Sequence, residues 1–122
     1  MSKKHSLSKS FAYAFEGLGA AFKNQPNFRI QAVIAILSLF LATALKFSWL
    51  EMSILILTAS TVLILELINT ALEALVDLVS EEIKPKAKIA KDVSAAAVLL
   101  SAILSVVVGI FLFLPKLFKL WS

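Results

Sequence analysis

Three long apolar runs limit what this chain can fold into. They lie at about 28–46, 49–80 and 92–115, and Pro115 and Lys116 close the third. A helix of about 20 apolar residues crosses the hydrocarbon core of a bilayer. Charged residues make up only 16% of the 122 residues, against about a quarter of a typical soluble domain. The runs therefore predict an all-α integral membrane protein with a single domain, residues 1–122, and three transmembrane helices.

The segment before the first run is amphipathic. Between Leu7 and Phe22 the apolar residues recur at helical spacing, and Lys9, Glu16 and Lys23 occupy other positions around the helix. A helix of this kind lies in the plane of the membrane surface. We therefore expect a surface helix over about 6–24. Packing of its apolar face on the other helices is compatible with that position.

Basic residues are distributed unequally about the runs. Nine of the 12 Lys and Arg residues precede or open the first run or lie between the second and the third, and the other three lie elsewhere. Cytoplasmic segments of membrane proteins are enriched in Lys and Arg. This asymmetry predicts a cytoplasmic N-terminus and a cytoplasmic second connection.

The second run ends in a stripe of polar residues. Glu66, Asn69, Glu73 and Asp77 stand at offsets of 0, 3, 7 and 11, which at about 100° per residue fall within roughly 80° of one another on a helix. An ionisable residue at membrane depth costs about 2.5–3.5 kcal/mol on insertion scales. The stripe therefore indicates a functional site. The alternative is a set of carboxylates that are solvated beyond the membrane surface.

The connection between the second and third runs is basic, with Lys84, Lys86, Lys88 and Lys91. Carboxylates hold Mg²⁺ through one or two oxygens while phosphates and water supply the rest. Lysines and a helix N-terminus neutralise phosphate oxygens. Together with the stripe, this connection favours a phosphoryl-transfer site on the side of the membrane where ATP is. Taken alone, the lysines are more typical of an ordinary cytoplasmic loop.

Several classes of site are excluded by the residues present. The chain has no cysteine and one histidine, His5, so a disulfide, a thiolate metal site and a histidine metal cluster are ruled out. The sequence contains no Walker A loop, dinucleotide fingerprint or protein-kinase signature. We expect no nucleic-acid partner. If the chain uses ATP, it does so without a standard nucleotide-binding fold.

Four segments carry a resemblance to a known family. E-L-I-N-T-A-L-E-A-L-V-D at 66–77 and A-K-D-x-x-A-A-A-V at 90–98 resemble the signature of the small prokaryotic diacylglycerol kinase/undecaprenol kinase family. F-A-Y-A-F-E-G-L-x-A-A-F at 11–22 and N-F-R-I at 27–30 are similar to its N-terminal pattern. The resemblance implies a homotrimer of three-span subunits in the bacterial inner membrane. It also implies that MgATP is used to phosphorylate a membrane lipid alcohol.

The resemblance assigns roles to individual residues. It implies that Glu66 is the catalytic base near the lipid hydroxyl, that Asn69 supports it, and that Glu73 is a Mg²⁺ ligand close to the nucleotide. The remaining residues that it places at ATP are Tyr13, Asp77, Glu82, Lys84, Lys91 and Asp92.

Three positions depart from the family pattern. A histidine that is common in the connection is replaced by Lys84, and a serine of some members falls on Ala95. A family glutamate that helps bind the metal falls on Gln25 here. A carboxamide oxygen can still ligate Mg²⁺, but without the charge the affinity for metal should fall. Gln25 is therefore a candidate metal ligand. The alternative is that it only caps or packs the turn before Pro26.

The identity of the lipid rests on a shorter signal. Residues 110–117, I-F-L-F-L-P-K-L, resemble the undecaprenol-kinase branch, so we expect undecaprenol as the acceptor, with diacylglycerol as the alternative.

Two other classes of function stay open. The stripe could join helices in a membrane scaffold through polar contacts, or it could line an ion or proton pathway.

Overall fold

The computed structural model describes residues 6–79, 82 and 84–122. This part of the chain contains no strand and forms four helices: α1 (Leu7–Asn24), α2 (Pro26–Ala44), α3 (Trp49–Val79) and α4 (Pro85–Lys119). α2, α3 and α4 are each long and apolar enough to cross a bilayer. The prediction of an all-α membrane fold with three spans is confirmed. The expected end of the second span, near residue 80, lies outside the described residues.

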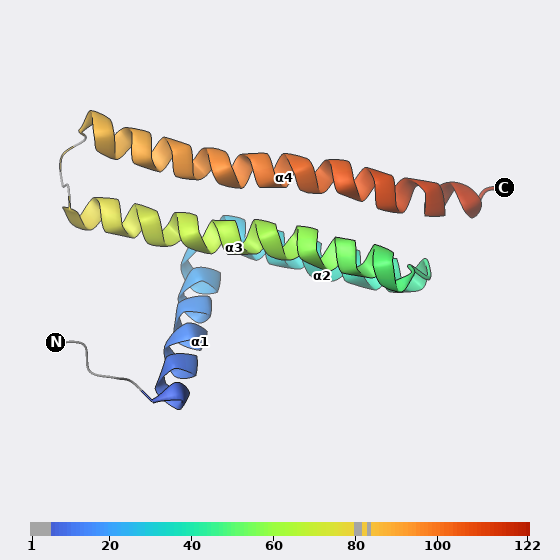
Figure 1. Ribbon diagram of the computed structural model, residues 1–122, viewed down its shortest axis with the longest axis horizontal. Helices are drawn as coiled ribbons and strands as arrows, with labels where there is room; N and C mark the ends of the chain where they lie inside the picture. Colours follow the sequence, from blue (N-terminus) through green and yellow to red (C-terminus); the bar gives the residue numbers. More distant parts are fainter. Residues whose placement is uncertain (1–5, 80–81, 83) are drawn as a thin grey trace.

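The three long helices lie side by side, and α1 runs across their direction (Figure 1). α3 packs against both α2 and α4, whereas α1 packs on α2. Within the described part of α1, only Ala21 is buried. A helix that runs sideways from the spans and is otherwise exposed has the orientation of a surface helix. Among the spans, α3 is the central helix, because both α2 and α4 pack against it.

A sharp corner joins α1 to α2. Gln25 is extended there, with φ −116° and ψ 100°, and Pro26 opens α2, where its missing N–H costs no helical hydrogen bond. The guanidinium of Arg29 reaches back and donates to the carbonyl oxygens of Phe22 at 2.9 Å and Lys23 at 2.8 Å. A cation at the last carbonyls of a helix is favourable. Arg29 therefore ties the end of α1 to the start of α2.

The turn between α2 and α3 is fastened to the end of α4. Ser48 and Glu51 cap α3 reciprocally: the Ser48 N–H donates to Glu51 Oε1 at 2.9 Å, and the Glu51 N–H donates to Ser48 Oγ at 3.1 Å. Glu51 also pairs with Lys116 Nζ at 3.1 Å. The rings of Phe47 and Phe113 meet with their centroids 4.8 Å apart. These contacts hold all three spans together at the end far from the polar stripe.

α4 is longer at both ends than the apolar run that predicts it. It begins at Pro85, so Lys86, Lys88, Lys91 and Asp92 lie on helical turns rather than in a loop. It also continues through Pro115 to Lys119 instead of ending at the proline. A proline inside a membrane helix is tolerated where neighbouring structure satisfies the freed backbone, and the contact of Lys116 with α3 holds this last part in place.

Few side chains in the described part of the chain are buried. The buried apolar residues are Ala21, Phe28, Ala42, Leu55 and Val62. Large apolar residues are exposed on every helix, among them Phe40, Leu57 and Phe111 at 71%, 68% and 75%. A soluble protein does not leave so much apolar surface uncovered. The exposed faces therefore suit lipid or another subunit.

We expect Arg29→Met to loosen the last turn of α1 while leaving the spans intact. The substitution keeps an unbranched side chain but removes both hydrogen bonds to the carbonyls of Phe22 and Lys23. Two exposed hydrogen bonds from a cation should be worth about 1 kcal/mol, or roughly fivefold faster amide exchange in residues 20–25. Hydrogen exchange followed by mass spectrometry measures this. Lys23→Met is the matched control, because the Lys23 side chain makes no bond within the described residues. Equal exchange in the two variants would contradict the role of Arg29.

Candidate active site

The polar stripe of α3 lies against the rest of the subunit. Glu66 is only 3% exposed and Asn69 only 8%, and both are buried on the same face of the helix as Leu55 and Val62. The hydroxyl of Thr70 donates to the backbone carbonyl of Glu66 at 2.9 Å. A buried carboxylate is costly unless it is paired or serves a reaction. The burial of Glu66 therefore marks the centre of the candidate site.

Asn69 lies on the same face of α3 as Glu66 and contacts the next carboxylate along the stripe. Its Nδ2 donates to Glu73 Oε1 at 3.3 Å, one helical turn away. Its Oδ1 is buried and has no hydrogen-bond partner within the described residues. The Asn69 amide oxygen and the Glu73 carboxylate oxygens are each hard donors of the kind that Mg²⁺ prefers.

The end of the stripe makes contact with α4. Asp77 forms an ion pair with Lys91, and the side chains of these two residues are 64% and 40% exposed. Lys91 is also attracted by the charge of Glu73. The first turns of α4 are thereby held beside the last turns of α3. The cation and the carboxylates therefore lie at one edge of the site, as phosphate binding would require.

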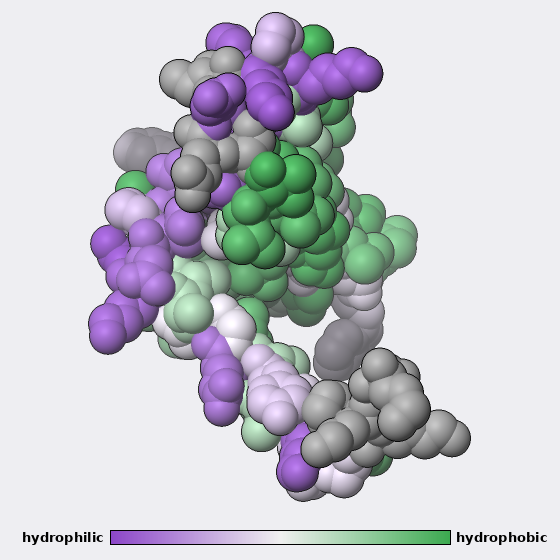
Figure 2. All heavy atoms as spheres, turned by 90° about the vertical axis from the view of Figure 1, so that its left-hand side faces the viewer, coloured by the Kyte–Doolittle hydropathy of each residue, from purple (hydrophilic) through white to green (hydrophobic). Residues whose placement is uncertain are grey.

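The other lysines of the connection separate into two groups. Lys88 pairs with Asp92 on the same face of α4. Lys84 and Lys86 line a hollow of about 390 Å³ together with Leu75, Val76 and Val79 of α3. Figure 2, which looks at the end of the molecule where α3 finishes and α4 begins, shows hydrophilic side chains gathered around the apolar body.

The predicted site residues are brought together only in part. Asn69, Glu73, Asp77 and Lys91 are linked by contacts across α3 and α4, and Glu66 is buried on the same face of α3 as Asn69. The others lie on its margins: Tyr13 is exposed on α1, Gln25 is half-buried at the corner, and Glu82, Lys84 and Asp92 are exposed in or near the connection.

Gln25 is not joined to the stripe by a hydrogen bond among the described residues. Its side chain makes no capping hydrogen bond to α2 either, and the cap of α1 is made by its backbone N–H, which donates to the Ala21 carbonyl oxygen at 2.9 Å. The backbone of the corner is therefore hydrogen-bonded without help from the side-chain amide of Gln25.

No group of three or more His, Cys, Asp or Glu side chains in the described part is arranged as a metal cluster.

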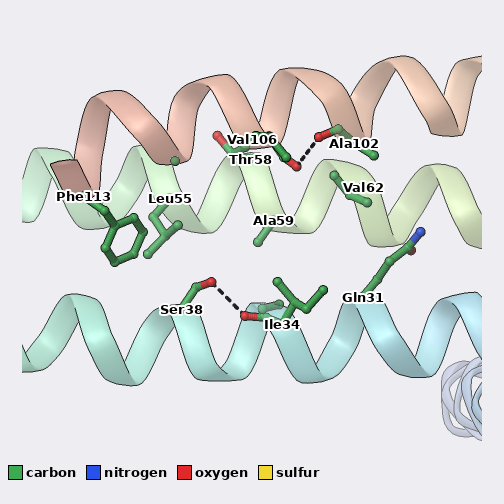
Figure 3. A pocket seen from close by; sticks show the side chains of 13 residues that line it. Gln31, Ile34, Ser38, Leu55, Thr58, Ala59, Val62, Ala102, Val106 and Phe113 are labelled. Atoms are coloured by element: carbon green, nitrogen blue, oxygen red, sulfur yellow. Dashed lines mark hydrogen bonds between the residues drawn. The ribbon is translucent and has the colours of Figure 1, made fainter.

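The structure also contains a feature that sequence reasoning missed. A hollow of about 300 Å³ lies between α2, α3 and α4, below the stripe, with Gln31 at one end and Phe113 at the other (Figure 3). The Oε1 atom of Gln31 is buried and has no partner within the described residues. One signal in the sequence points to this hollow: Leu55, Ala59 and Val62 continue the helical spacing of the stripe toward the middle of the membrane.

Comparison with known proteins identifies the family. Residues 12–113 match the family described as prokaryotic diacylglycerol kinase, and this match covers most of the chain. The chain belongs to this family. The resemblance found in the sequence is thereby confirmed, and the carboxylate stripe of α3 falls inside the matched region.

Individual relatives agree with the family. The chain is 46% identical over 115 residues to the diacylglycerol kinase of Synechocystis sp., covering 93% of this chain and 66% of that protein. It is 38% identical over 109 residues to the undecaprenol kinase of Bacillus subtilis, covering 89% of each. It is 34% identical over 101 residues to the diacylglycerol kinase of Escherichia coli K12, covering 83% of each. The family and these names indicate a lipid kinase.

We expect the Asp77–Lys91 pair to be the salt-sensitive link between α3 and α4. Asp77→Asn and Lys91→Met should each lower the thermal stability of the purified protein, and the double variant should be no less stable than the worse of the two. The coupling should shrink at high ionic strength, because the pair is exposed and therefore screened. A double-mutant cycle of unfolding temperatures at low and high salt measures it. Lys88→Met is the control, because Lys88 pairs within its own helix; additive effects of the two variants at low salt would refute the link.

Proposed function

We propose that this protein transfers the γ-phosphoryl group of ATP to the hydroxyl of a membrane lipid alcohol. The observation that carries the proposal is the burial of Glu66 beside Asn69 and Glu73, at the point where an apolar helix becomes polar. A carboxylate at that boundary can meet a hydroxyl that stays in the membrane and a nucleotide that stays in water. Membership of the prokaryotic diacylglycerol kinase family supports the same reaction.

Glu66 is the group that we assign as general base. It accepts the proton of the lipid hydroxyl as that oxygen bonds to the γ-phosphorus, and the bond between this phosphorus and the bridging oxygen breaks to release ADP. The products are a lipid phosphate and ADP. Asn69 lies one turn away and holds the adjoining carboxylate in place. Phosphoryl transfer depends mainly on such positioning and on neutralisation of charge.

The residues beside Glu66 fit a divalent metal, which we take to be Mg²⁺. Glu73 and the unpartnered Oδ1 of Asn69 supply oxygen donors, and Gln25 is a further candidate ligand. When bound, the metal neutralises phosphate charge. Lys91 adds a positive charge at the same edge.

The nucleotide would lie over the junction of α3 and α4. Asp77 and Lys91 mark this junction. We assign the remaining contacts to Tyr13, Glu82, Lys84 and Asp92, as the family resemblance implies. Tyr13 would have to approach from α1, which is held at its corner by Arg29.

For the lipid we propose undecaprenol, with diacylglycerol as the alternative. The C-terminal resemblance of residues 110–117 favours undecaprenol. Relatives named for each lipid match this chain, so the family membership is compatible with both. Competition between the two acceptors, each present at the same mole fraction in one bilayer, measures the preference.

We further propose that the protein is a homotrimer in the bacterial inner membrane, with its N-terminus in the cytoplasm. The excess of basic residues before α2 and between α3 and α4 supports this orientation. The large exposed apolar faces of the spans leave surface for contact with neighbouring subunits. In this orientation the stripe opens toward the cytoplasm, where ATP is available.

We expect Glu66→Gln to lower kcat for lipid phosphorylation by about 10²–10⁴-fold, the usual contribution of a general base. The amide keeps the size of the side chain, so folding and nucleotide binding should be little changed. Thin-layer analysis of the lipid fraction measures turnover, and titration with a fluorescent ATP analogue measures binding. Glu16→Gln makes the same change at an exposed carboxylate on α1 and should retain activity. Full activity in Glu66→Gln would remove Glu66 as the base.

We expect Gln25→Glu to lower the Mg²⁺ concentration that gives half-maximal activity. An anionic oxygen attracts a divalent cation more strongly than a neutral carbonyl does, and a low dielectric enlarges the difference. Glu73→Gln should raise that concentration sharply or abolish activity. Mg²⁺ titrations of the three proteins test the pair of assignments. Superimposable titrations for the wild type and Gln25→Glu would remove Gln25 from the metal site.

A further inference from the structure

The hollow of about 390 Å³ where α3 ends and α4 begins combines apolar walls with two cations. We call it the junction hollow, and the residues that line it are Leu75, Val76, Val79, Lys84, Lys86 and Ala87. Figure 2 looks at this end of the molecule and shows hydrophobic surface directly beside hydrophilic side chains. The junction hollow is therefore open to an amphiphilic ligand.

Most of the α3 wall of the junction hollow lies away from the polar stripe. Leu75 and Val79 belong to this wall, and at about 100° per residue each is roughly 160° around the helix from Asp77. Leu75 is about 180° from Glu66 on the same count. The junction hollow is therefore distinct from the stripe, although Lys84, which we place at the nucleotide, also borders it.

The two lysines of the junction hollow lack a counter-charge. Lys88 and Lys91 of the same connection each pair with an aspartate, whereas Lys84 and Lys86 form no ion pair within the described residues. Glu82, although near in sequence, does not line the junction hollow. The hollow therefore carries positive charge that the described part of the chain does not neutralise.

The backbone sets the shape of the junction hollow. Lys84 is extended, with φ −90° and ψ 146°, because a residue that precedes a proline is largely restricted to this region. Pro85 then opens α4. Ala87 is half-buried at the wall, and its small side chain leaves space beside the helix.

The junction hollow lies at the edge of the bilayer. A crossing of about 20 residues that begins at Trp49 ends near Ile68, and Leu75 is about 10 Å further along α3 at 1.5 Å per residue. This is the outer edge of the lipid headgroups. Yet Leu75, Leu78 and Val79 are 55%, 82% and 78% exposed. Apolar surface at this level needs a cover that also tolerates contact with water.

These properties together select the class of ligand. A soluble anion would neutralise the lysines but leave the apolar walls uncovered, and a neutral lipid would cover the walls but leave the lysines without a counter-charge. An anionic phospholipid does both, since its phosphate accepts hydrogen bonds from lysine and its glycerol and first methylene groups are apolar. The volume falls within the range for ligand pockets, which is about 300–1,000 Å³.

We propose that the junction hollow binds one anionic phospholipid. Its phosphate lies at Lys86 and Lys84, and the start of its acyl chains lies against Leu75 and Val79. The proposal goes beyond lipid phosphorylation, because this lipid is bound without being phosphorylated. It holds the junction of α3 and α4 at a fixed depth beside the site that we propose for the nucleotide.

Photolabelling without ATP tests the proposal. The full-length protein is reconstituted in phosphatidylcholine nanodiscs that contain a small fraction of phosphatidylglycerol with a diazirine at the start of one acyl chain. We expect label on Leu75, Val79 and Ala87, and an excess of unlabelled phosphatidylglycerol should reduce it. Equal labelling of these residues by a phosphatidylcholine probe of the same design would overturn the proposal.

Two lysine substitutions form a matched pair. Lys86→Met and Lys88→Met each remove one positive charge from the start of α4, but only Lys86 lines the junction hollow. We expect Lys86→Met to lower labelling by phosphatidylglycerol about fivefold and Lys88→Met to leave it nearly unchanged. Equal losses in the two variants would overturn the proposal, because general attraction between a basic segment and an anionic surface would then explain the labelling.

Ala87→Phe tests the hollow apart from its charge. The substitution keeps every lysine and fills the space beside α4, so labelling should fall as far as in Lys86→Met while helix content by circular dichroism stays the same. Labelling equal to that of the wild type would overturn the hollow as the binding site. None of these measurements needs turnover, so a failure here leaves the lipid-kinase function standing, and an inactive kinase leaves the phospholipid site standing.

Discussion

The burial of one carboxylate, that of Glu66, is the constraint on which the rest of the structure depends. An ionisable group at membrane depth costs about 2.5–3.5 kcal/mol on insertion scales, and here it lies on the central helix of three. Packing of α2 and α4 against α3 covers this face, and the far end is fastened through Glu51 and Lys116. The cost of burying this charge is thus offset by the packing of the three helices, including contacts at the opposite end of α3. The polar stripe lies at the other end of α3, where we propose that the nucleotide binds.

Helical periodicity in the sequence predicts the three spans and the shared face of the polar stripe. Three apolar runs predicted three spans, and offsets of 0, 3, 7 and 11 predicted that Glu66, Asn69, Glu73 and Asp77 share a face. The start of α4 was harder, because lysines in a basic connection are typical of a loop as well as of a first helical turn. The ion pair of Asp77 with Lys91 is one contact that the early start of α4 makes possible, because the added turns place Lys91 on the helix beside the end of the stripe.

Other features depend on contacts between helices, which periodicity does not encode. The Arg29 guanidinium reaches back to the carbonyls of Phe22 and Lys23, and only the angle of the corner makes this possible. The hollow is lined by small residues from three helices, among them Ala35 of α2, Ala59 of α3 and Ala102 of α4. In the sequence, Gln31 is only a polar residue that interrupts the first apolar run. Its meaning comes from the unpartnered oxygen at the end of that hollow.

In the proposed function, α3 connects the membrane to the aqueous phase. Its apolar first part lies in hydrocarbon, and its polar last part is where the phosphates of ATP would bind. Transfer of phosphorus from one phase to the other is therefore its most direct test. The purified full-length chain is reconstituted with undecaprenol and diacylglycerol and supplied with ATP labelled in the γ-phosphate and with Mg²⁺. Label should move into the organic-soluble fraction, and label placed in the α-phosphate should stay in water. If all γ-label stays in the aqueous phase while ATP is bound, the protein does not phosphorylate lipid.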